Sequence, residues 1–491
     1  MGFSEHSLIL KNDGTLWGCG YNYYGNLGLG DTTDRNTFTQ ITINTDNIKE
    51  VYCGYYHTFI LKNDGTLWGC GDNSYGELGL GDTTNRKIFT QVTTNADNIK
   101  EVYCGGSYTI ILKNDGTLWG CGANGGGQLG LGDTTDRNTF TKITINTDNI
   151  KEVYCGGNHT IILKNDGTLW GCGSNYYGQL GLGDTDNRNI FTQITTNTNN
   201  IKQVYCGYYY TLILKNDGSL WGCGYNYNGQ LGLGDSDDRY TFTEIATNAN
   251  DIKSICCGSH HTLILKNDGS LWGTGRNNCS QLGLGDTTDR TIFTQVTTNI
   301  NNIKEIYCGA NHTFMLKNDG TLWGTGRNDF GNLGLKDTNY RTTFTQITAN
   351  TNDIKSFPNQ CNATAIKVYD LNVGLVETLD TNNFRNIPVD KFEKIKILYT
   401  NPTDTLIAGL ISFDNKTTWK MFTGTSWTTI SDITPNNILL NGMSMEKINN
   451  LTKETLVQGG FTGNINFRIV LKTNDDTKTP SITKIYIEYK K

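Results

Sequence analysis

One motif, Leu61-Lys62-Asn63-Asp64-Gly65-Thr66-Leu67-Trp68-Gly69, recurs almost letter for letter through most of this chain. The step from Trp17 to Trp68 is 51 residues, and no insertion or deletion interrupts the later steps. The tryptophan series is Trp17, Trp68, Trp119, Trp170, Trp221, Trp272 and Trp323. A strict period of about 50 residues is typical of a propeller or a solenoid, in which one supersecondary unit is repeated.

Each unit is predicted to hold four short β-strands. In the second unit they are expected at 49–53, 57–62, 66–71 and 88–92, where β-branched and aromatic residues gather. Asp64-Gly65 predicts a tight turn between the second and third strands, because this pair tolerates positive φ. No segment of the unit shows a helical spacing of apolar residues. Four antiparallel strands repeated seven times predict an all-β, seven-bladed propeller over residues 1–358.

The ends of the repeat region predict how the ring closes. The chain begins inside a unit, because His6–Leu10 already matches the second strand. The missing first strand reappears at Ile354–Phe357. We therefore expect 354–357 to complete the first blade, which removes the open strand edges that a linear array would expose.

The 14 cysteines fall mostly on two repeat positions. One series is Cys19, Cys70, Cys121, Cys172 and Cys223, and the other is Cys53, Cys104, Cys155, Cys206, Cys257 and Cys308. Metal ligation, disulfides and buried free thiols are the three alternatives. The last two units replace the first series by Thr274 and Thr325 but keep the second, so a Cys pair within each blade is not obligatory. Reduced, buried thiols are favoured, which suits a reducing compartment.

Two other repeated positions are predicted to be structural. His6, His57, His159, His261 and His312 alternate with Tyr108 and Tyr210, so a hydrogen-bonding role is favoured over a metal or catalytic one. An Asp and an Arg four residues apart, such as Asp31 and Arg35, recur in every unit and are expected to clamp the long loop. We find no nucleophile–base set, phosphate loop or zinc spacing, and therefore predict no enzyme activity, no catalytic residue, no metal and no cofactor.

Composition excludes some classes of partner. The formal net charge is −6 and no basic block is present, which argues against nucleic-acid binding. No apolar run approaches membrane-spanning length, so we expect no membrane insertion. The amino terminus has no charged and then apolar leader, so no signal peptide is expected.

The positions that vary among the units cluster in two loops, one between the first and second strands and one after the third strand. Both loops are expected at one face of the disc, because the first and third connections of an antiparallel blade lie at the same end. This face would be rich in Tyr, Asn, Ser and Gly, a composition typical of binding surfaces. Drift in tolerant loops is the alternative. The candidate ligand-binding residues are Tyr23, Tyr24, Tyr55, Tyr56, Tyr75, Tyr176, Tyr177, Tyr208, Tyr209 and Tyr227.

Three recurring motifs carry a family resemblance: Gly127–Asp133, Cys155–Thr160 and Asp166–Trp170. Together they resemble the repeats of the regulator of chromosome condensation family over roughly the predicted propeller. The resemblance implies a seven-bladed propeller, but a propeller does not settle function. Guanine-nucleotide exchange, which the family would suggest, is disfavoured because no unit carries an inserted wedge and no basic tail is present.

Residues 362–491 have a different composition and no repeat. Strands are expected at 366–369, 394–399, 406–413, 419–422, 467–472 and 482–489, and one helix at 444–456. This pattern predicts a C-terminal β-sandwich of jelly-roll type.

Several segments of this part resemble a β-sandwich module of phage-tail and tailocin proteins: Ser412–Lys420, Trp427, Asn449–Thr452, Phe467–Thr473 and Pro480–Ile485. The resemblance implies a non-enzymatic receptor-binding component that is made in a bacterial cytoplasm and carried on a virion or phage-tail-like particle. Its partners would be a bacterial surface glycan or surface protein, and other virion or tail proteins. The alternative is a bacterial intracellular scaffold or secreted effector that uses the propeller for protein–protein interaction.

Overall fold

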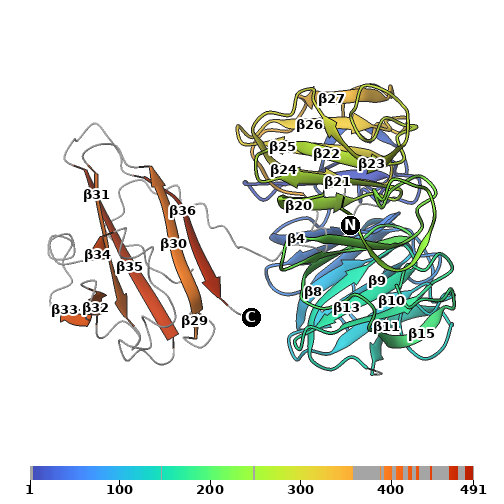
Figure 1. The fold of residues 1–491 in the computed structure, drawn as a ribbon, viewed down its shortest axis with the longest axis horizontal. Helices are drawn as coiled ribbons and strands as arrows, with labels where there is room; N and C mark the ends of the chain where they lie inside the picture. The colour runs from blue at the N-terminus through green and yellow to red at the C-terminus, as the bar shows by residue number, and fades with distance from the viewer. Residues whose placement is uncertain are drawn as a thin grey trace. The chain divides into compact units, whose positions relative to one another are not determined.

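Seven four-stranded antiparallel sheets make up the N-terminal part of the protein in the computed structural model (Figure 1). The structure describes residues 4–144, 146–246 and 249–357, together with the backbone of eight strands beyond residue 386. The chain divides into two units, 1–362 and 363–491. Each sheet of the first unit is one blade of a seven-bladed β-propeller.

The blades follow one another in chain order, and the first alone takes strands from both ends of the repeat region. The first blade contains β28 (Ile354–Ser356), β1 (His6–Lys11), β2 (Leu16–Gly20) and β3 (Arg35–Ile41). The second contains β4 (Ile48–Cys53), β5 (His57–Lys62), β6 (Leu67–Gly71) and β7 (Arg86–Gln91). The third contains β8 (Ile99–Cys104), β9 (Tyr108–Lys113), β10 (Leu118–Gly122) and β11 (Arg137–Ile143).

The other four blades repeat the same pattern. The fourth contains β12 (Ile150–Cys155), β13 (His159–Lys164), β14 (Leu169–Gly173) and β15 (Arg188–Ile194). The fifth contains β16 (Ile201–Cys206), β17 (Tyr210–Lys215), β18 (Leu220–Gly224) and β19 (Arg239–Glu244). The sixth contains β20 (Ile252–Cys257), β21 (His261–Lys266), β22 (Leu271–Gly275) and β23 (Arg290–Val296). The seventh contains β24 (Ile303–Cys308), β25 (His312–Lys317), β26 (Leu322–Gly326) and β27 (Arg341–Ile347).

β28 supplies the innermost strand of the first blade. It runs antiparallel to β1, with Ile354 opposite Lys11. Ile354 and Phe357 are buried in the cluster that joins the seventh blade to the first, and the Phe357 ring stacks on Tyr307 with centroids 4.2 Å apart. The two ends of the repeat region therefore meet in one sheet and one core.

Packing between blades repeats around the ring. Each long loop after the third strand brings a left-handed glycine against a phenylalanine of the next blade. At the closing interface Gly334 has φ +68°, and a Cβ there would lie 2.8 Å from the Phe38 ring. Two features require glycine at this position: the positive φ, and the lack of space for a Cβ atom. The contact from the seventh blade to the first is thus the same as that between consecutive blades.

A closed set of side-chain hydrogen bonds, which we call the hydroxyl ring, links all seven blades. A His or Tyr at the start of the second strand meets a Thr or Ser hydroxyl of the next blade at 2.8–3.1 Å. The pairs are His6–Thr58, His57–Thr109, Tyr108–Thr160, His159–Thr211, Tyr210–Thr262, His261–Thr313 and His312–Ser7. This arrangement supports the structural role predicted for the His/Tyr position.

The hydroxyl ring determines the state of its histidines. Thr58 donates its own proton to the Asn26 carbonyl at 2.7 Å, so the Thr58 oxygen must accept from Nε2–H of His6. The other Thr and Ser hydroxyls of the hydroxyl ring donate to equivalent carbonyls. Burial lowers the pKa of all five histidines of the ring to about 3, so they are neutral near pH 7.

The repeated Asp and Arg form the predicted clamp in every blade. Arg Nη2 lies 2.5–2.6 Å from the carboxylate of the Asp four residues earlier. In the first blade Asp31 also accepts from the Asn22 side chain and from the Thr33 amide. The clamp therefore closes the long loop on itself.

The cysteines differ from the prediction at one position. Cys308 forms a disulfide with Cys256, although both series were expected to be reduced. Cys256 occupies a position where most other blades carry tyrosine, and such a tyrosine shares a hydrophobic cluster with the cysteine of the next blade, as Tyr52 does with Cys104. A cysteine at 256 thus places two sulfurs in contact across the sixth and seventh blades. The remaining cysteines of the two series are buried and form no disulfide in the described part of the chain.

The second unit contains two sheets. Its strands are β29 (Ile387–Pro388), β30 (Phe392–Thr400), β31 (Thr405–Ser412), β32 (Trp419–Phe422), β33 (Trp427–Ile430), β34 (Met443–Ser444), β35 (Asn464–Thr473) and β36 (Ser481–Tyr489). One sheet has the order β29-β35-β31-β32-β33, with β34 paired to β31, and the other pairs β30 with β36. The predicted strand at 366–369 and the body of the predicted helix, 445–456, lie outside the described residues. The jelly-roll sandwich stays a prediction.

Removing β28 is expected to destabilise the propeller. A chain that ends at Asp353 loses the buried side chains of Ile354 and Phe357, each worth roughly 1.5–3 kcal/mol, and exposes the edge of β1. The matched control ends at Asn362, which keeps β28 and removes the same second unit. Urea unfolding should show a lower midpoint for the chain ending at 353, and equal midpoints would contradict the closure.

Acid should destabilise the protein through the hydroxyl ring. The folded-state pKa of about 3 lies below the unfolded value of 6.5, so only the unfolded chain takes up a proton as the pH falls through this interval. Each histidine then costs up to about 1.4 kcal/mol of stability per pH unit below 6.5 and nothing above it.

His159→Tyr, which copies Tyr108 and Tyr210, should reduce that slope by the share of one histidine. The free energy of unfolding measured from pH 8 to pH 5 checks this. An unchanged slope would mean that His159 is charged or exposed in the folded protein.

The thiol pattern can be read by alkylation and mass spectrometry. Denaturation with an alkylating agent and no reductant should give one linked peptide pair, Cys256–Cys308. The buried cysteines of the two series, other than Cys308, should be alkylated only after unfolding, whereas half-buried Cys279 reacts in the native state. Cys256→Tyr restores the residue of the other blades and should leave Cys308 alkylatable. Linked peptides from other blades would overturn the assignment.

Candidate functional site

Five backbone hydrogen bonds link equivalent residues of the loops between first and second strands, in two series, one from Tyr55 to Tyr208 and one from Ser259 to Ser4. We call the seven equivalent residues the axial ring: Ser4, Tyr55, Gly106, Gly157, Tyr208, Ser259 and Ala310. The amide of Gly106 donates to the Gly157 carbonyl, and the amide of Gly157 donates to Tyr208, both at 3.0 Å. The axial ring brings these seven loops together, so their side chains form one continuous surface.

Tyrosines cross this surface in a connected band. Tyr55 and Tyr208 come from the second and fifth blades, and their ring centroids lie 5.8 Å apart. The equivalent residues between them are glycines, and a Cβ at Gly157 would lie 2.7 Å from the Tyr208 ring. Two bulky residues can therefore meet over the third and fourth blades only because those blades carry no side chain at this position.

The band continues in both directions through neighbouring loops. On one side Tyr55 packs on Tyr56, which contacts Tyr24 and Tyr21 with centroid distances of 5.0 and 5.2 Å. On the other side Tyr208 packs on Tyr209, and the contacts run on to Tyr177 and Tyr225. Contacts between the two kinds of variable loop place both on one surface, which we call the tyrosine face.

The ten predicted candidates divide into three groups. Tyr24, Tyr55, Tyr56, Tyr177, Tyr208 and Tyr209 are half-buried members of the band. Tyr23, Tyr176 and Tyr227 are 65–72% exposed, and each ring contacts one or more members of the band. Tyr75 is half exposed and makes no ring contact among the described residues. The structure does not bring Tyr75 into the band.

Sequence reasoning left out several members of the same surface. Tyr21, Tyr225, Phe330 and His260 all contribute ring contacts to the band. All four lie in the loops already identified as variable, so the signal was present. The sequence could not show which aromatic residues of these loops touch, because those contacts depend on how the loops meet in the folded ring.

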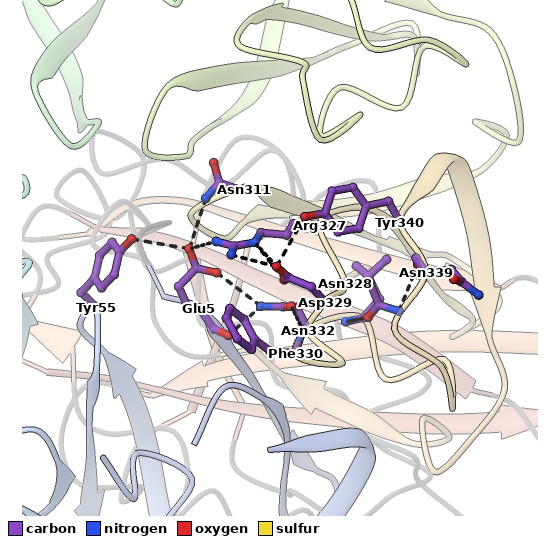
Figure 2. A network of polar contacts seen from close by, with 11 residues as sticks. Glu5, Tyr55, Asn311, Arg327, Asn328, Asp329, Phe330, Asn332, Asn339 and Tyr340 are labelled. Atoms are coloured by element: carbon purple, nitrogen blue, oxygen red, sulfur yellow. Dashed lines mark hydrogen bonds and ion pairs between the residues drawn. The ribbon is translucent and has the colours of Figure 1, made fainter. Parts of the chain in front are cut away.

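A charged network lies at one end of the band (Figure 2). Glu5 is 2% exposed, and it accepts hydrogen bonds from Asn311 at 3.1 Å and from Arg327 at 3.2 Å. Arg327 also pairs with Asp329. Burial raises the pKa of Glu5, and Arg327 offsets part of that shift. Burial opposes the charge of Arg327, but Asp329 and Glu5 outweigh it and raise the Arg327 pKa.

A pocket of about 270 Å³ opens beside this network on the tyrosine face. It is lined by Tyr55, Tyr208, Tyr209, Ser259, His260, Arg276 and Asn311. Burial raises the pKa of Tyr208 to about 12 and lowers that of His260 to about 4, so both are neutral near pH 7. The lining therefore offers neutral hydrogen-bonding groups and one cation, Arg276. This composition suits recognition by hydrogen bonds.

The described residues hold no cluster of three or more His, Cys, Asp or Glu side chains that could bind a metal ion. Among these residues, no helix is long and apolar enough to cross a membrane.

Family models match nearly the whole propeller. A model described as "RCC1-like domain" matches residues 88–357, which is more than half of the chain. Two models described as "Regulator of chromosome condensation (RCC1) repeat" match 13–61 and 48–77. The matches cover the same repeats that build the seven blades.

Three curated proteins illustrate the relatives of this protein. It is 34% identical over 345 residues to the ultraviolet-B receptor UVR8 of Arabidopsis thaliana, in an alignment that spans 68% of this sequence and 77% of the receptor. It is 32% identical over 302 residues to the human X-linked retinitis pigmentosa GTPase regulator, over 60% of this sequence and 29% of that protein. It is 31% identical over 329 residues to the human probable E3 ubiquitin-protein ligase HERC4, over 65% of this sequence and 31% of the ligase.

Solved structures support the fold at lower identity. Yeast RCC1 (Prp20), solved in complex with Kap60, superposes with a TM-score of 0.62 at 19% identity, over 71% of this protein and 86% of that one. Human WBSCR16 superposes with a TM-score of 0.60 at 20% identity, over 70% of this protein and 94% of WBSCR16. At this identity the likeness concerns the propeller fold alone.

Proposed function

This chain belongs to the RCC1-like repeat family, and we propose that it is a non-enzymatic binding protein that captures a protein partner on the tyrosine face. Its relatives include a receptor, a GTPase regulator and a probable ubiquitin ligase, so one propeller family accompanies several activities. The shared element is the propeller, and a role in protein interaction is the simplest one that such different proteins have in common.

The band of tyrosines carries this proposal. Tyrosine offers a large contact area at a small cost in side-chain entropy, and its hydroxyl remains able to hydrogen-bond. In this protein the contacts between rings hold most of the band in place before any partner arrives. A pre-organised surface loses less entropy on binding, which favours affinity.

The band is also asymmetric, which favours one partner site over seven equal ones. The third blade contributes Gly106 and Gly125-Gly126 at positions where other blades carry tyrosine. The sixth contributes His260 and Arg276, and the seventh Asn311 and Arg327. The partner is therefore expected to lie across the second and fifth blades and to extend towards the sixth and seventh.

The finer role predicted from the sequence is that of a host-surface receptor-binding component of a phage-like particle. Tyrosine rings also stack on sugars, so a bacterial envelope glycan would suit the same surface. The resemblance behind that role lies in 390–491, where side chains are outside the described residues. The relatives named above favour a protein partner, and the following experiment separates the two classes.

Photo-cross-linking should identify the partner and the face together. A benzophenone amino acid is placed at exposed Tyr176 or Tyr227 and, as the control, at exposed Asn63 in a turn of the fixed Asn-Asp-Gly series. Cross-links to one protein from Tyr176 and Tyr227, and none from Asn63, are expected. Cross-links to wall glycan from the same positions would favour the phage role, and cross-links from Asn63 alone would contradict the proposal.

Replacing the centre of the band should weaken binding of the partner identified in this way. We expect a change to Ala to weaken the free energy of binding by about 1–2 kcal/mol at each of four positions, Tyr55, Tyr56, Tyr208 and Tyr209. The same change at exposed Tyr75 should alter the free energy of binding very little. The dissociation constant is measured for each variant alongside its melting temperature. A quadruple variant that folds normally and binds as well as the parent would remove the tyrosine face from consideration.

A further inference from the structure

We propose that the pocket beside the axial ring binds a carboxylate that a polypeptide presents, either on an acidic residue or at its carboxyl terminus. This inference rests on the proposed function, because it assigns the part of a protein partner that enters the tyrosine face. Two observations support it: a cation without a carboxylate partner, and buried polar atoms without hydrogen bonds. The charge of the neighbouring network disfavours a dianion relative to a carboxylate.

Arg276 is the cation. Arg276 and Arg327 occupy equivalent positions in the sixth and seventh blades. Arg327 pairs with Glu5 and Asp329, whereas the guanidinium of half-buried Arg276 has no ion pair or hydrogen bond with any described residue. A guanidinium presents a rigid fork of donors that matches a carboxylate. The sixth blade therefore carries the same residue as the seventh but leaves it available to a ligand.

Two pocket atoms lack the hydrogen bonds that burial normally requires. Ser259 is 5% exposed and its Oγ has no partner among the described residues. Nδ1 of His260 is likewise buried and unpaired. Both residues line the pocket together with Arg276. An unpaired buried polar group destabilises the protein, so a ligand that accepts from Ser259 Oγ–H would offset part of this destabilisation.

The neighbouring charges favour a monoanion. Glu5 and Asp329 carry two negative charges against the one positive charge of Arg327, so this network has a net charge of −1 when all three are ionised. A dianionic phosphate would be repelled more strongly than a carboxylate by this excess. Tyr208, whose pKa is raised to about 12 by burial, is neutral near pH 7 and adds no charge to the pocket.

Small probes can test the pocket on the full-length protein without the unidentified partner. We choose N-acetyl-glutamate N-methylamide for the carboxylate of an acidic residue, acetyl-glycyl-glycine for a terminal carboxylate, N-acetyl-glutamine N-methylamide as the neutral isostere, and inorganic phosphate. Binding is followed by the NMR resonance of the Arg276 Nε–H group. At least one carboxylate probe is expected to bind in the millimolar range and about tenfold more tightly than the neutral isostere.

Variants assign any effect to the pocket. Arg276→Gln should abolish binding of the carboxylate probe, followed in this variant by saturation-transfer signals on the probe, and Ser259→Ala should weaken it several-fold. Lys87→Gln removes the same charge from an exposed outer strand and should change nothing. Each variant is checked by its melting temperature.

The outcomes separate this inference from the proposed function. No response of Arg276 to either carboxylate probe, equal binding of the glutamine isostere, or tighter binding of phosphate would overturn the carboxylate pocket. The cross-linking and Tyr→Ala measurements would stand in each case, because they do not depend on Arg276.

Discussion

The hydrogen bond between a His or Tyr of one blade and a hydroxyl of the next is the contact on which the propeller depends. In each case the hydroxyl also donates to a loop carbonyl of the preceding blade, so one Thr joins two elements of its neighbour, as Thr109 joins His57 and Glu77. The site is buried, so an unpaired member could not turn to water, and losing one partner costs more than the bond itself contributes. In six of the seven blades a glycine three residues before the His or Tyr completes the requirement, because a Cβ at Gly54 would lie 2.1 Å from the His57 ring.

This framework is what allows the tyrosine face to vary. The hydroxyl ring, the Asp–Arg clamps and the glycine–phenylalanine contacts recur in all seven blades, so they position the loops without using the side chains at the loop tips. The backbone bonds of the axial ring then bring equivalent loop positions together. Seven similar units consequently produce one asymmetric surface. On it, Tyr55 and Tyr208 meet across the two blades that carry glycine at the equivalent position, and a polar pocket lies beside the sixth and seventh blades.

Much of the framework was predictable, because comparing the same position in seven units shows which residue types that position tolerates. A histidine that alternates with tyrosine argues against metal ligation, and an Asp–Arg pair present in seven of seven units favours a structural role. The disulfide at position 256 could not be predicted in this way. Cys256 departs from the repeat, and its bond to Cys308 depends on which side chains face each other across two blades. No spacing within one unit contains that information.

The sequence by itself determined the number of blades, the strands within each blade and the repeated His/Tyr and Asp–Arg positions that are structural, because these are local patterns repeated at a constant period. It also identified the loops that form the variable face. Only the tertiary structure decided which members of those loops touch. Tyr55 and Tyr208 are three repeats apart, and Glu5 and Arg327 lie at opposite ends of the repeat region. Such contacts arise because a closed ring brings every loop to one axis, so distance along the sequence no longer predicts distance in space.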